Sequence, residues 1–249
     1  MPSEPTAVRA WLSASRRLLA EKKLGGLMLH VENPCLFSPD ETAVVQKLSE
    51  FLKEHDSFTV DTVANTIFPS QLNQGDGIEA LSLRYMKVYN RVMKGKGWGR
   101  YFQRMVNWKT PKKEPINQIS AIIQRLKSRY EEGGKFYRDA YEIGIYSPDR
   151  DLNKHRGRQC LSLIELKPTD DLKLHMTAVY RNHYYIQKTL GNLIGLGNLL
   201  RFIATESGYE VGTLTIVSTR AELDVDGWTI KKLTKLLDDC EAMLTTHAA

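Results

Sequence analysis

The chain has 249 residues, of which 42% are hydrophobic and 26% are charged, enough for one large globular core or two small domains. Its 17 glycines and 9 prolines are too few for a collagen-like or low-complexity chain, and no apolar run approaches the roughly 18 residues of a membrane span. The formal net charge of +6 is typical of a protein with a phosphate or polyanion partner, or of a basic surface with no particular partner.

The N-terminal residues and the cysteines bear on the cellular compartment. Residues 1–5 have neither the basic start nor the apolar stretch of a signal peptide, so a soluble, cytoplasmic protein is expected. Cys35, Cys160 and Cys240 lie far apart, and such a sparse, odd set argues against a disulfide framework and against a cysteine-based zinc site. The histidines show no metal-ligand spacing, so no metal site is predicted.

The N-terminal part of the chain mixes helical and strand-like patterns. Apolar residues recur at helical spacing over 6–22, and residues 27–31 have the pattern of a short buried strand. Ser38 precedes a proline and lies three residues before a glutamate, which predicts a capped helix from there to His55. Residues 58–63, rich in threonine and valine, are β-like.

The middle of the chain contains two further predicted helices. Residues 77–93 form the first, and the basic, glycine-rich stretch 94–100 that follows is predicted to be a flexible loop. An amphipathic helix is predicted from Pro115, because apolar residues recur along one face as far as Tyr130. The two glycines at 133–134 end it.

The C-terminal part is predicted to combine a hairpin with a long buried helix. The predicted strands are 161–166, 174–180 and 211–217, and the predicted helices are 184–205 and 228–244. The helix over 184–205 is apolar nearly all round, which is typical of burial in the middle of a domain. No internal repeat or linker is visible, so one α+β domain over 1–249 is expected.

Three polar residues of this part are candidates for chemistry. Cys160 stands between a basic loop and a strand, where nearby positive charge favours the nucleophilic thiolate. Arg181 ends the next strand, where a guanidinium can bind a phosphate in a bidentate manner. Asn192 lies in the apolar helix and offers a donor and an acceptor, which suits the edge of a pyrimidine ring.

Each of these residues also has an ordinary structural interpretation. A lone cysteine beside a strand is often a small core residue, and an arginine at a strand end often lies at the surface or in a salt bridge. Asn192 could bond within its own helix. His183, two residues after Arg181, could face a ligand, although a surface imidazole is the expectation. A functional interpretation therefore requires all three candidate residues together.

Together they resemble the thymidylate synthase family, including its nucleotide hydroxymethylase relatives. In that family a nucleophilic cysteine at a strand start is followed by a hairpin, an arginine closing the second strand and a long buried helix carrying an asparagine. Here Arg181 follows Cys160 by 21 residues and Asn192 follows Arg181 by 11, which fits. The segments 204–212, 116–127 and 98–100 are also similar to family segments. The resemblance implies an α+β fold with a mixed sheet flanked by helices around that long helix.

The resemblance implies a role for each matching residue. Cys160 would add to C6 of a pyrimidine nucleotide and make C5 nucleophilic, so that a one-carbon group from 5,10-methylenetetrahydrofolate could be transferred to C5. Arg181 would hold the 5′-phosphate, with Asn182 beside it, and Asn192 would hydrogen-bond the N3 and C4 edge of the ring. Arg138 best matches an arginine that the partner subunit contributes, which implies a homodimer with shared active sites.

The sequence departs from the family pattern at the positions that transfer protons and contact the folate. The family histidine after the cysteine is Leu161, the tyrosine of the central loop is Trp98, and the catalytic glutamate falls near Asn65. The folate-contacting aspartate is Tyr184. Because positioned proton transfer contributes roughly 10²–10⁴-fold to such reactions, ordinary methylation of dUMP is expected to be slow or absent.

Two carboxylates are the last candidate ligands, and the sequence leaves three candidate functions. Glu222 and Asp224 stand where the family has a sugar-binding histidine and tyrosine, and they would contact a changed sugar or base. The first function is a methyl- or hydroxymethyltransferase acting on a pyrimidine nucleotide. The alternative is a non-catalytic nucleotide-binding or assembly module of the same fold. Binding or modification of a nucleic acid is the third, weaker candidate.

Overall fold

The computed structural model describes residues 3–93, 101–109, 114–132, 139–155, 157–225 and 227–245, and it has the α+β class expected from the sequence. The helices are α1 (Ala7–Glu21), α2 (Pro39–Glu54), α3 (Val60–Ile67), η1 (Ser70–Leu72), α4 (Gly77–Met93), α5 (Tyr101–Val106), α6 (Gln118–Glu132), α7 (Pro148–Asp151), η2 (Tyr185–Thr189), α8 (Leu190–Ser207) and α9 (Ile230–Thr245). The strands are β1 (Glu4–Thr6), β2 (Lys23–Asn33), β3 (Glu142–Gly144), β4 (Leu161–Pro168), β5 (Lys173–Tyr180), β6 (His183–Tyr184) and β7 (Glu210–Glu222).

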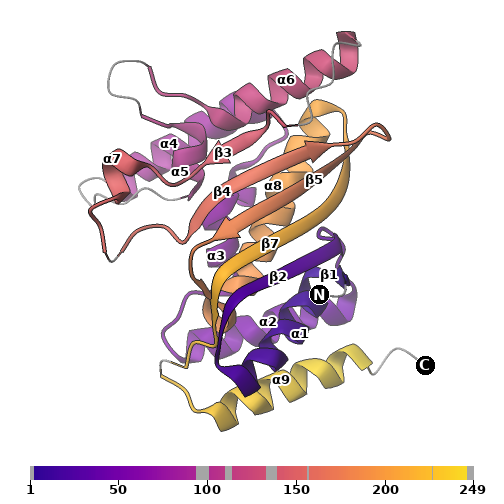
Figure 1. Ribbon diagram of the computed structural model, residues 1–249, viewed down its shortest axis with the longest axis vertical. Helices are drawn as coiled ribbons and strands as arrows, with labels where there is room; N and C mark the ends of the chain where they lie inside the picture. The colour runs from indigo at the N-terminus through magenta and orange to yellow at the C-terminus, as the bar shows by residue number, and fades with distance from the viewer. Residues whose placement is uncertain are drawn as a thin grey trace.

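The described strands form one open, mixed sheet in the order β1-β2-β7-β5-β4-β3, and the short β6 also pairs with β7 (Figure 1). Strands β4 and β5 are the antiparallel hairpin expected from the sequence. Strands β5 and β7 are parallel, so the chain must cross over between them, and α8 makes that crossover. The carboxyl end of β5 therefore leads directly into the start of the helix that carries Asn192.

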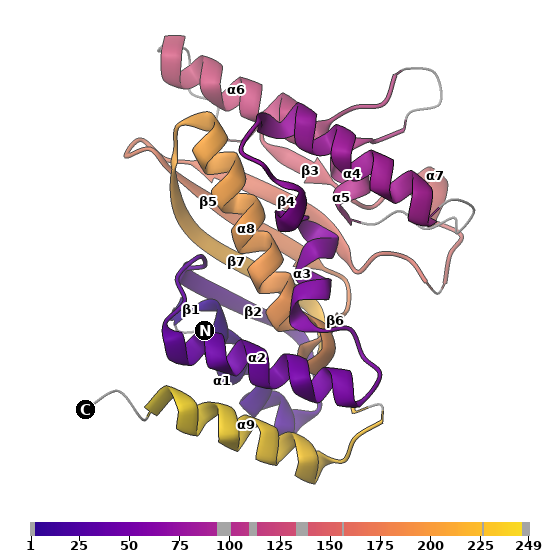
Figure 2. The same ribbon diagram turned by 180° about the vertical axis from the view of Figure 1, so that it is seen from behind.

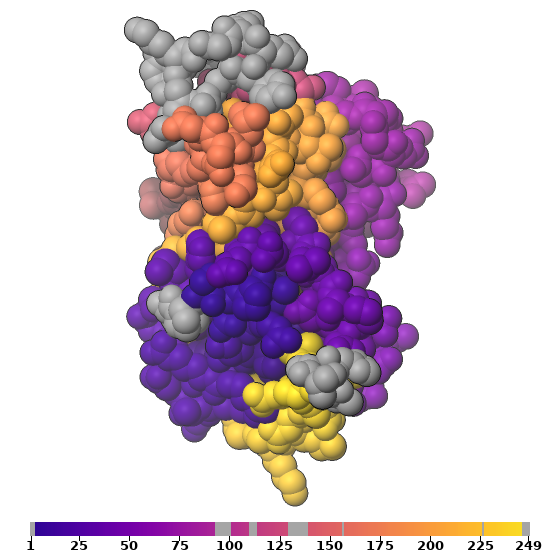
Figure 3. Space-filling view, turned by 90° about the vertical axis from the view of Figure 1, so that its right-hand side faces the viewer, coloured from indigo at the N-terminus to yellow at the C-terminus, as the bar shows by residue number. Residues whose placement is uncertain are grey.

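The helices lie mainly on one face and at one end of the sheet. Seen from behind (Figure 2), α8 and α3 lie across the sheet, and α1, α2 and α9 gather near β2. From the side (Figure 3), the indigo N-terminal residues lie below the orange segments, and the yellow C-terminal segment lies below the indigo residues. Among the described residues, no helix covers the face of β2, β7, β5 and β4 that Figure 1 presents.

Helix α8 is the centre of the core. Most of its residues are buried, and the leucines and isoleucines around it pack on every side. Two of its glycines allow α3 to approach closely. A Cβ atom at Gly191 would lie 2.6 Å from Cβ of Val63, and one at Gly195 would lie 2.7 Å from the carbonyl oxygen of Ala64. Helix α3 is therefore held directly against the helix that carries Asn192.

The β-like interpretation of residues 58–63 is wrong, because the structure places α3 there. Thr59 caps this helix, since its side chain accepts a hydrogen bond from the backbone N–H of Thr62. The buried residues of α3 recur at helical spacing and form the face that packs on α8. The local preference of valine and threonine for strands is thus outweighed by tertiary packing.

Other elements agree with the sequence, with shifted ends. Ser38 makes the capping box with Glu41 that was expected, and α2 ends one residue before His55. The amphipathic helix begins at Gln118 rather than Pro115. The first turn of the predicted helix over 184–205 is a π-helical turn, η2, before α8 begins. Six short elements, β1, η1, α5, β3, α7 and β6, have no counterpart in the sequence-based assignment.

The described buried apolar side chains form one contiguous cluster that extends from α1 to α9. In the described ranges, no helix has both the length and the apolar character that crossing a membrane requires.

Candidate functional site

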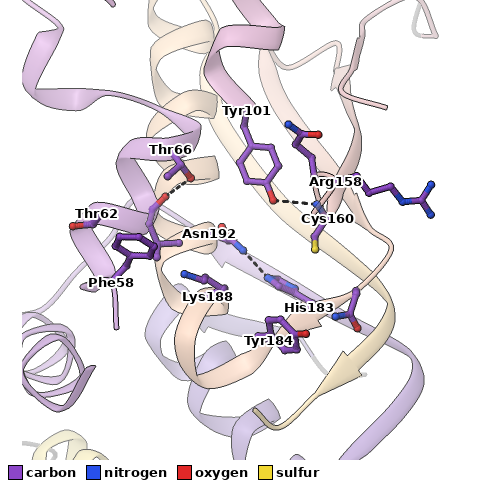
Figure 4. A pocket seen from close by; sticks show the side chains of 13 residues that line it. Phe58, Thr62, Thr66, Tyr101, Arg158, Cys160, His183, Tyr184, Lys188 and Asn192 are labelled. Atoms are coloured by element: carbon purple, nitrogen blue, oxygen red, sulfur yellow. Dashed lines mark hydrogen bonds between the residues drawn. The ribbon is translucent and has the colours of Figure 1, made fainter. Parts of the chain in front are cut away.

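A cavity of about 280 Å³ lies where α3, the start of α5, the loop before β4, and the segment from β6 to α8 meet (Figure 4). Cys160 and Asn192, the thiol and the carboxamide singled out in the sequence, both line it. So does Asn182, whose Oδ1 is buried and makes no hydrogen bond within the described residues. The cavity therefore offers a nucleophile, an amide and an acceptor without a partner.

Cys160 is half-buried at the end of the loop that leads into β4, next to a phenol. The backbone N–H groups of Cys160 and Leu161 donate to Oη of Tyr101, over 3.3 and 3.4 Å. Burial raises the pKa of Tyr101 to about 12, so this phenol keeps its proton at neutral pH. The sequence assigned no phenol to the site; Trp98, which matches the family tyrosine, lies outside the described residues.

Two effects act in opposite directions on the pKa of the Cys160 thiol. Burial raises the pKa of its thiol above the ordinary value of 9.0, while the positive charges of Arg181, Arg158 and Lys188 lower it by less. The thiol is therefore mainly protonated at neutral pH in the protein without a ligand. Burial also lowers the pKa of Lys188, which lines the same cavity.

Replacing Lys188 by methionine should slow alkylation of Cys160 by iodoacetamide about two- to fivefold at neutral pH. Removing this cation raises the thiol pKa, and below that pKa the thiolate fraction falls in proportion. Mass spectrometry that resolves each thiol measures the rate, with Cys35 as an internal reference. Cys35 is also half-buried, but its thiol donates to the carbonyl of Gly197 over 3.1 Å, and its rate should stay unchanged. An equal slowing of both thiols would contradict the electrostatic explanation.

Asn192 is held by a buried hydrogen-bonded chain. Its Nδ2 donates to Nε2 of His183 over 2.9 Å, Nδ1 of His183 lies 3.0 Å from Oγ of Ser218, and Oη of Tyr185 lies 3.1 Å from that Oγ. Burial lowers the pKa of His183 to about 3, so the imidazole is neutral. The expectation of a surface imidazole is wrong: His183 is 1% exposed, because it pairs within β6 and stacks on Tyr180.

Arg181 lies close to Cys160 but outside the cavity lining. Its Nε donates to the carbonyl of Gln159 and its Nη2 to the carbonyl of Arg158, both over 3.0 Å. These bonds fix the loop that delivers Cys160. The cations that do line the cavity are Arg158 and Lys188, neither of which the sequence had singled out as a ligand.

The two candidate carboxylates lie away from the cavity, and each already has partners. Glu222 forms ion pairs with Lys23 over 2.9 Å and Arg220 over 3.3 Å. The oxygens of Asp224 accept the backbone N–H groups of Ile186 and Gln187, over 2.8 and 2.9 Å, at the start of η2. Burial raises the pKa of Asp224 to about 6. Both residues thus have structural roles here.

Two further residues, Arg138 and Asn65, stand at positions for which the resemblance implied a role in the site. Arg138 lies outside the described residues. Asn65 stands where the resemblance placed a catalytic glutamate, but it bonds to Asp61 on its own helix and does not line the cavity. The side chains of α3 that do line it are those of Thr62, Val63 and Thr66.

Among the described lining residues none is an aspartate or a glutamate. The described ranges also contain no group of three or more His, Cys, Asp or Glu side chains that could hold a metal ion. The polar groups that the described lining does offer are the thiol, the side-chain amides, the hydroxyls of threonines and tyrosines, the neutral imidazole and two cations.

These features define an α+β protein whose central buried helix and adjoining hairpin present a thiol and a carboxamide to one cavity. No protein-family model matches the chain. Curated relatives do, each named "Putative thymidylate synthase". The proteins of Methanosarcina mazei and Methanosarcina acetivorans are each 30% identical over 128 residues, which is 51% of this chain and 54% of theirs. That of Methanococcoides burtonii is 29% identical over 136 residues, 54% of this chain and 57% of its own.

The chain thus spans about half the length of the curated relatives it matches. Over that half, the chain is similar to these putative thymidylate synthases.

Proposed function

We propose that the cavity binds a pyrimidine nucleotide and that Cys160 adds to C6 of its ring. One observation carries the proposal: Cys160 and Asn192, from a strand start and a helix, line the same cavity. A thiol placed at one edge of a flat ring and a carboxamide at another suit a pyrimidine, since the carboxamide pairs with the N3 and C4 positions while C6 meets the sulfur. The name of the relatives supports the same substrate class.

The rest of the cavity suits the sugar and the phosphate. Arg158 and Lys188 are the described cations that line the cavity, where they attract an anion, and Arg181 adds positive charge beside the loop to which it is bonded. Asn182 presents a buried carbonyl oxygen without a partner, which a sugar hydroxyl or a ring N–H can satisfy. Two further residues predicted from the sequence therefore keep a role in the proposal. Arg181 contributes positive electrostatic potential, and Asn182 contacts the ligand directly.

The covalent step balances without an oxidant or a reductant. The sulfur of Cys160 forms a bond to C6, and the π electrons of the C5–C6 bond move to C5 and the C4 carbonyl. Solvent supplies a proton to C5, so C5 then holds two hydrogens. Loss of either hydrogen to solvent and departure of the sulfur from C6 restore the ring. A hydrogen label at C5 is therefore released to water each time the other hydrogen stays.

The described residues do not fit a bound folate. The described part of the cavity measures about 280 Å³, just below the roughly 300–1,000 Å³ typical of pockets for drug-sized ligands, which suits one small ligand. No described lining residue offers a carboxylate to an aminopyrimidine ring, and Tyr184 stands where the resemblance expects one. The proposed reaction therefore contains no step that needs a folate.

A nucleotide-binding module without turnover is the second candidate. Two observations favour it: the described lining lacks a carboxylate, and the thiol is mainly protonated at neutral pH. The two functions share the ligand and differ only in whether a label at C5 is released.

A homodimer belongs to the same proposal. The sheet face without a covering helix carries Met28, 47% exposed, and Leu163, 37% exposed, which supports contact with a second copy. Arg138 is the residue that the resemblance assigns to the cavity of the other copy.

Binding of dUMP or dCMP should be measurable by titration calorimetry, and Asn192→Ala should weaken it about 10- to 100-fold, because ring N–H and carbonyl groups lose their partner in a site shielded from water. Asn198→Ala is the matched control. Asn198 lies on the same helix, but its side chain bonds to Ser70 and Arg201 and does not line the cavity. If neither nucleotide binds the wild-type protein, the proposed function is wrong.

A further inference from the structure

A second cavity, of about 450 Å³, lies among α4, α5 and α7, which gather at the same end of the molecule in Figure 1 and Figure 2. It shares no described lining residue with the cavity of Cys160. Its volume is within the roughly 300–1,000 Å³ typical of sites for small organic ligands. The second cavity is therefore a separate candidate site, and an inference about it does not depend on the proposed function.

Positive charge is in excess around this second cavity. The described cations that line it are Arg104, Lys109, Arg150 and Lys154, and no described lining residue is a carboxylate. Two carboxylates lie just outside the lining. Asp151 pairs with Arg104 in the buried ion pair, and Asp149, beside Arg150, accepts a hydrogen bond from Ser147. Four cations thus face two carboxylates that already have partners, and this excess attracts a ligand with several negative charges.

The polar wall of the second cavity contains groups without good partners. Asn107 lines it, and the hydrogen-bond acceptor of its Nδ2 is the sulfur of Met86, 3.6 Å away. Oδ1 of Asn107 and Nε of Arg104 are buried and make no hydrogen bond within the described residues. Unpaired buried polar groups cost stability, and a polar ligand that reorients the Asn107 carboxamide can recover part of that cost.

The remaining lining suits a nucleoside better than a bare phosphate. Asn90 and Gln103 add two further side-chain amides, which can hydrogen-bond the edge of a base or the hydroxyls of a sugar. Tyr89 supplies an aromatic ring, and it stacks on Tyr85 with centroids 6.0 Å apart and planes 26° apart, so its position is supported. Aromatic rings of this kind stack on bases of any sequence.

We propose that this second cavity binds a nucleoside polyphosphate, with the cations holding the phosphates and the amides and Tyr89 holding the nucleoside. The cations converge on one cavity and do not follow an extended stripe, which favours a small ligand over a nucleic acid. The site also adjoins the first one through α5. Tyr101, at the start of that helix, accepts the backbone N–H of Cys160, while Gln103 and Arg104 line the second cavity.

The test is titration calorimetry with CTP, ATP and inorganic tripolyphosphate in magnesium-free buffer. At least one of the two nucleotides should bind the wild-type protein, and more tightly than tripolyphosphate does. The double variant Arg150→Gln with Lys154→Gln should weaken that binding about 10- to 100-fold, because it removes charge-assisted hydrogen bonds to the phosphates. Asn192→Ala should leave it unchanged, since Asn192 lines only the first cavity.

The matched control is Lys231→Gln with Lys232→Gln, which removes the same charge from the start of α9, away from the second cavity. It should bind the nucleotide as the wild type does. An equal loss in both double variants would overturn the proposal, as would a loss in Asn192→Ala or the failure of both nucleotides to bind.

Two further outcomes would replace the nucleoside polyphosphate by another ligand. Tripolyphosphate that binds as tightly as both nucleotides would contradict the nucleoside part. A single-stranded oligonucleotide that binds more tightly than either nucleotide, and loses affinity in Arg150→Gln with Lys154→Gln, would show a nucleic-acid site instead. None of these results bears on the binding of dUMP or dCMP near Cys160, so the proposed function stands or falls separately.

Discussion

Cys160→Ser should reduce the release of tritium from C5 of a bound pyrimidine nucleotide by at least about 10³-fold. Release requires a bond from residue 160 to C6, and a serine hydroxyl without an adjacent base is a far weaker nucleophile than a thiol. Binding should change little, since the two side chains differ by one atom. Wild-type release should increase with pH through neutrality and beyond pH 9.0, because burial places the pKa of the thiol above that value and only the thiolate adds to the ring.

Cys35→Ser is the matched control, because Cys35 is the other half-buried thiol and does not line the cavity. Its variant should release tritium at the wild-type rate. Release that survives in Cys160→Ser would show that another group attacks the ring. Tight binding of the nucleotide without any release by the wild type would instead support the binding module over the enzyme.

Asp151→Ala should lower the free energy of unfolding by about 3–5 kcal/mol. Arg104 and Asp151 are buried, with side-chain exposures of 4% and 2%, and the guanidinium donates to both oxygens of the carboxylate and to the carbonyl of Ile145. Removing Asp151 leaves a buried cation without its counter-charge. Thermal unfolding followed by circular dichroism should show a decrease in Tm of roughly 6–20 °C, at about 2–4 °C per kcal/mol for a chain of this size.

The double variant Arg104→Met with Asp151→Leu separates the cost of the unpaired charge from the value of the pair. It should be close to the wild type in stability, because a buried ion pair replaced by apolar side chains of similar size is often neutral. If the double variant is as unstable as Asp151→Ala, the loss has another cause.

The ion pair also predicts how stability depends on pH. Hydrogen bonds from Arg104 hold the pKa of Asp151 below its ordinary value of 3.8. Since the folded pKa is depressed, the contribution of the pair is complete above the unfolded pKa and is lost as pH falls through the folded one. The difference in stability between the wild type and Asp151→Ala should therefore be constant near neutrality and shrink below about pH 4.

The sequence was most informative where one pattern dominated. The hairpin and the helix carrying Asn192 followed from alternation and from a long apolar run, and the structure confirms both. The strand-like prediction for residues 58–63 was wrong. Valine and threonine favour strands locally, but packing against α8 stabilises a helix there. No local pattern marks the π-helical turn η2, which depends on the contacts of Asp224 with two backbone N–H groups.

Within the site, spacing along the chain identified Cys160 and Asn192, which do line one cavity. It named His183 but expected a surface imidazole, and it did not identify Tyr101. The positions of both depend on elements that meet only in three dimensions: β6 against β7, and α5 against the loop before β4. Lys188 had a usable signal, since it lies four residues before Asn192 and so on the same side of the chain near the helix start. The single domain over 1–249 and the role of Arg138 remain predictions.

The glycines of α8 have a consequence for how this protein can diversify. With Gly191 and Gly195 pressed against α3, neither helix can shift without opening a void or forcing atoms to overlap, so the wall they share is immobile. Changes of backbone that alter the ligand are therefore expected at the opposite rim, where Arg158 and Gln159 belong to a loop and Tyr184 is partly exposed. Related chains that accept larger or smaller molecules should differ there while keeping both glycines.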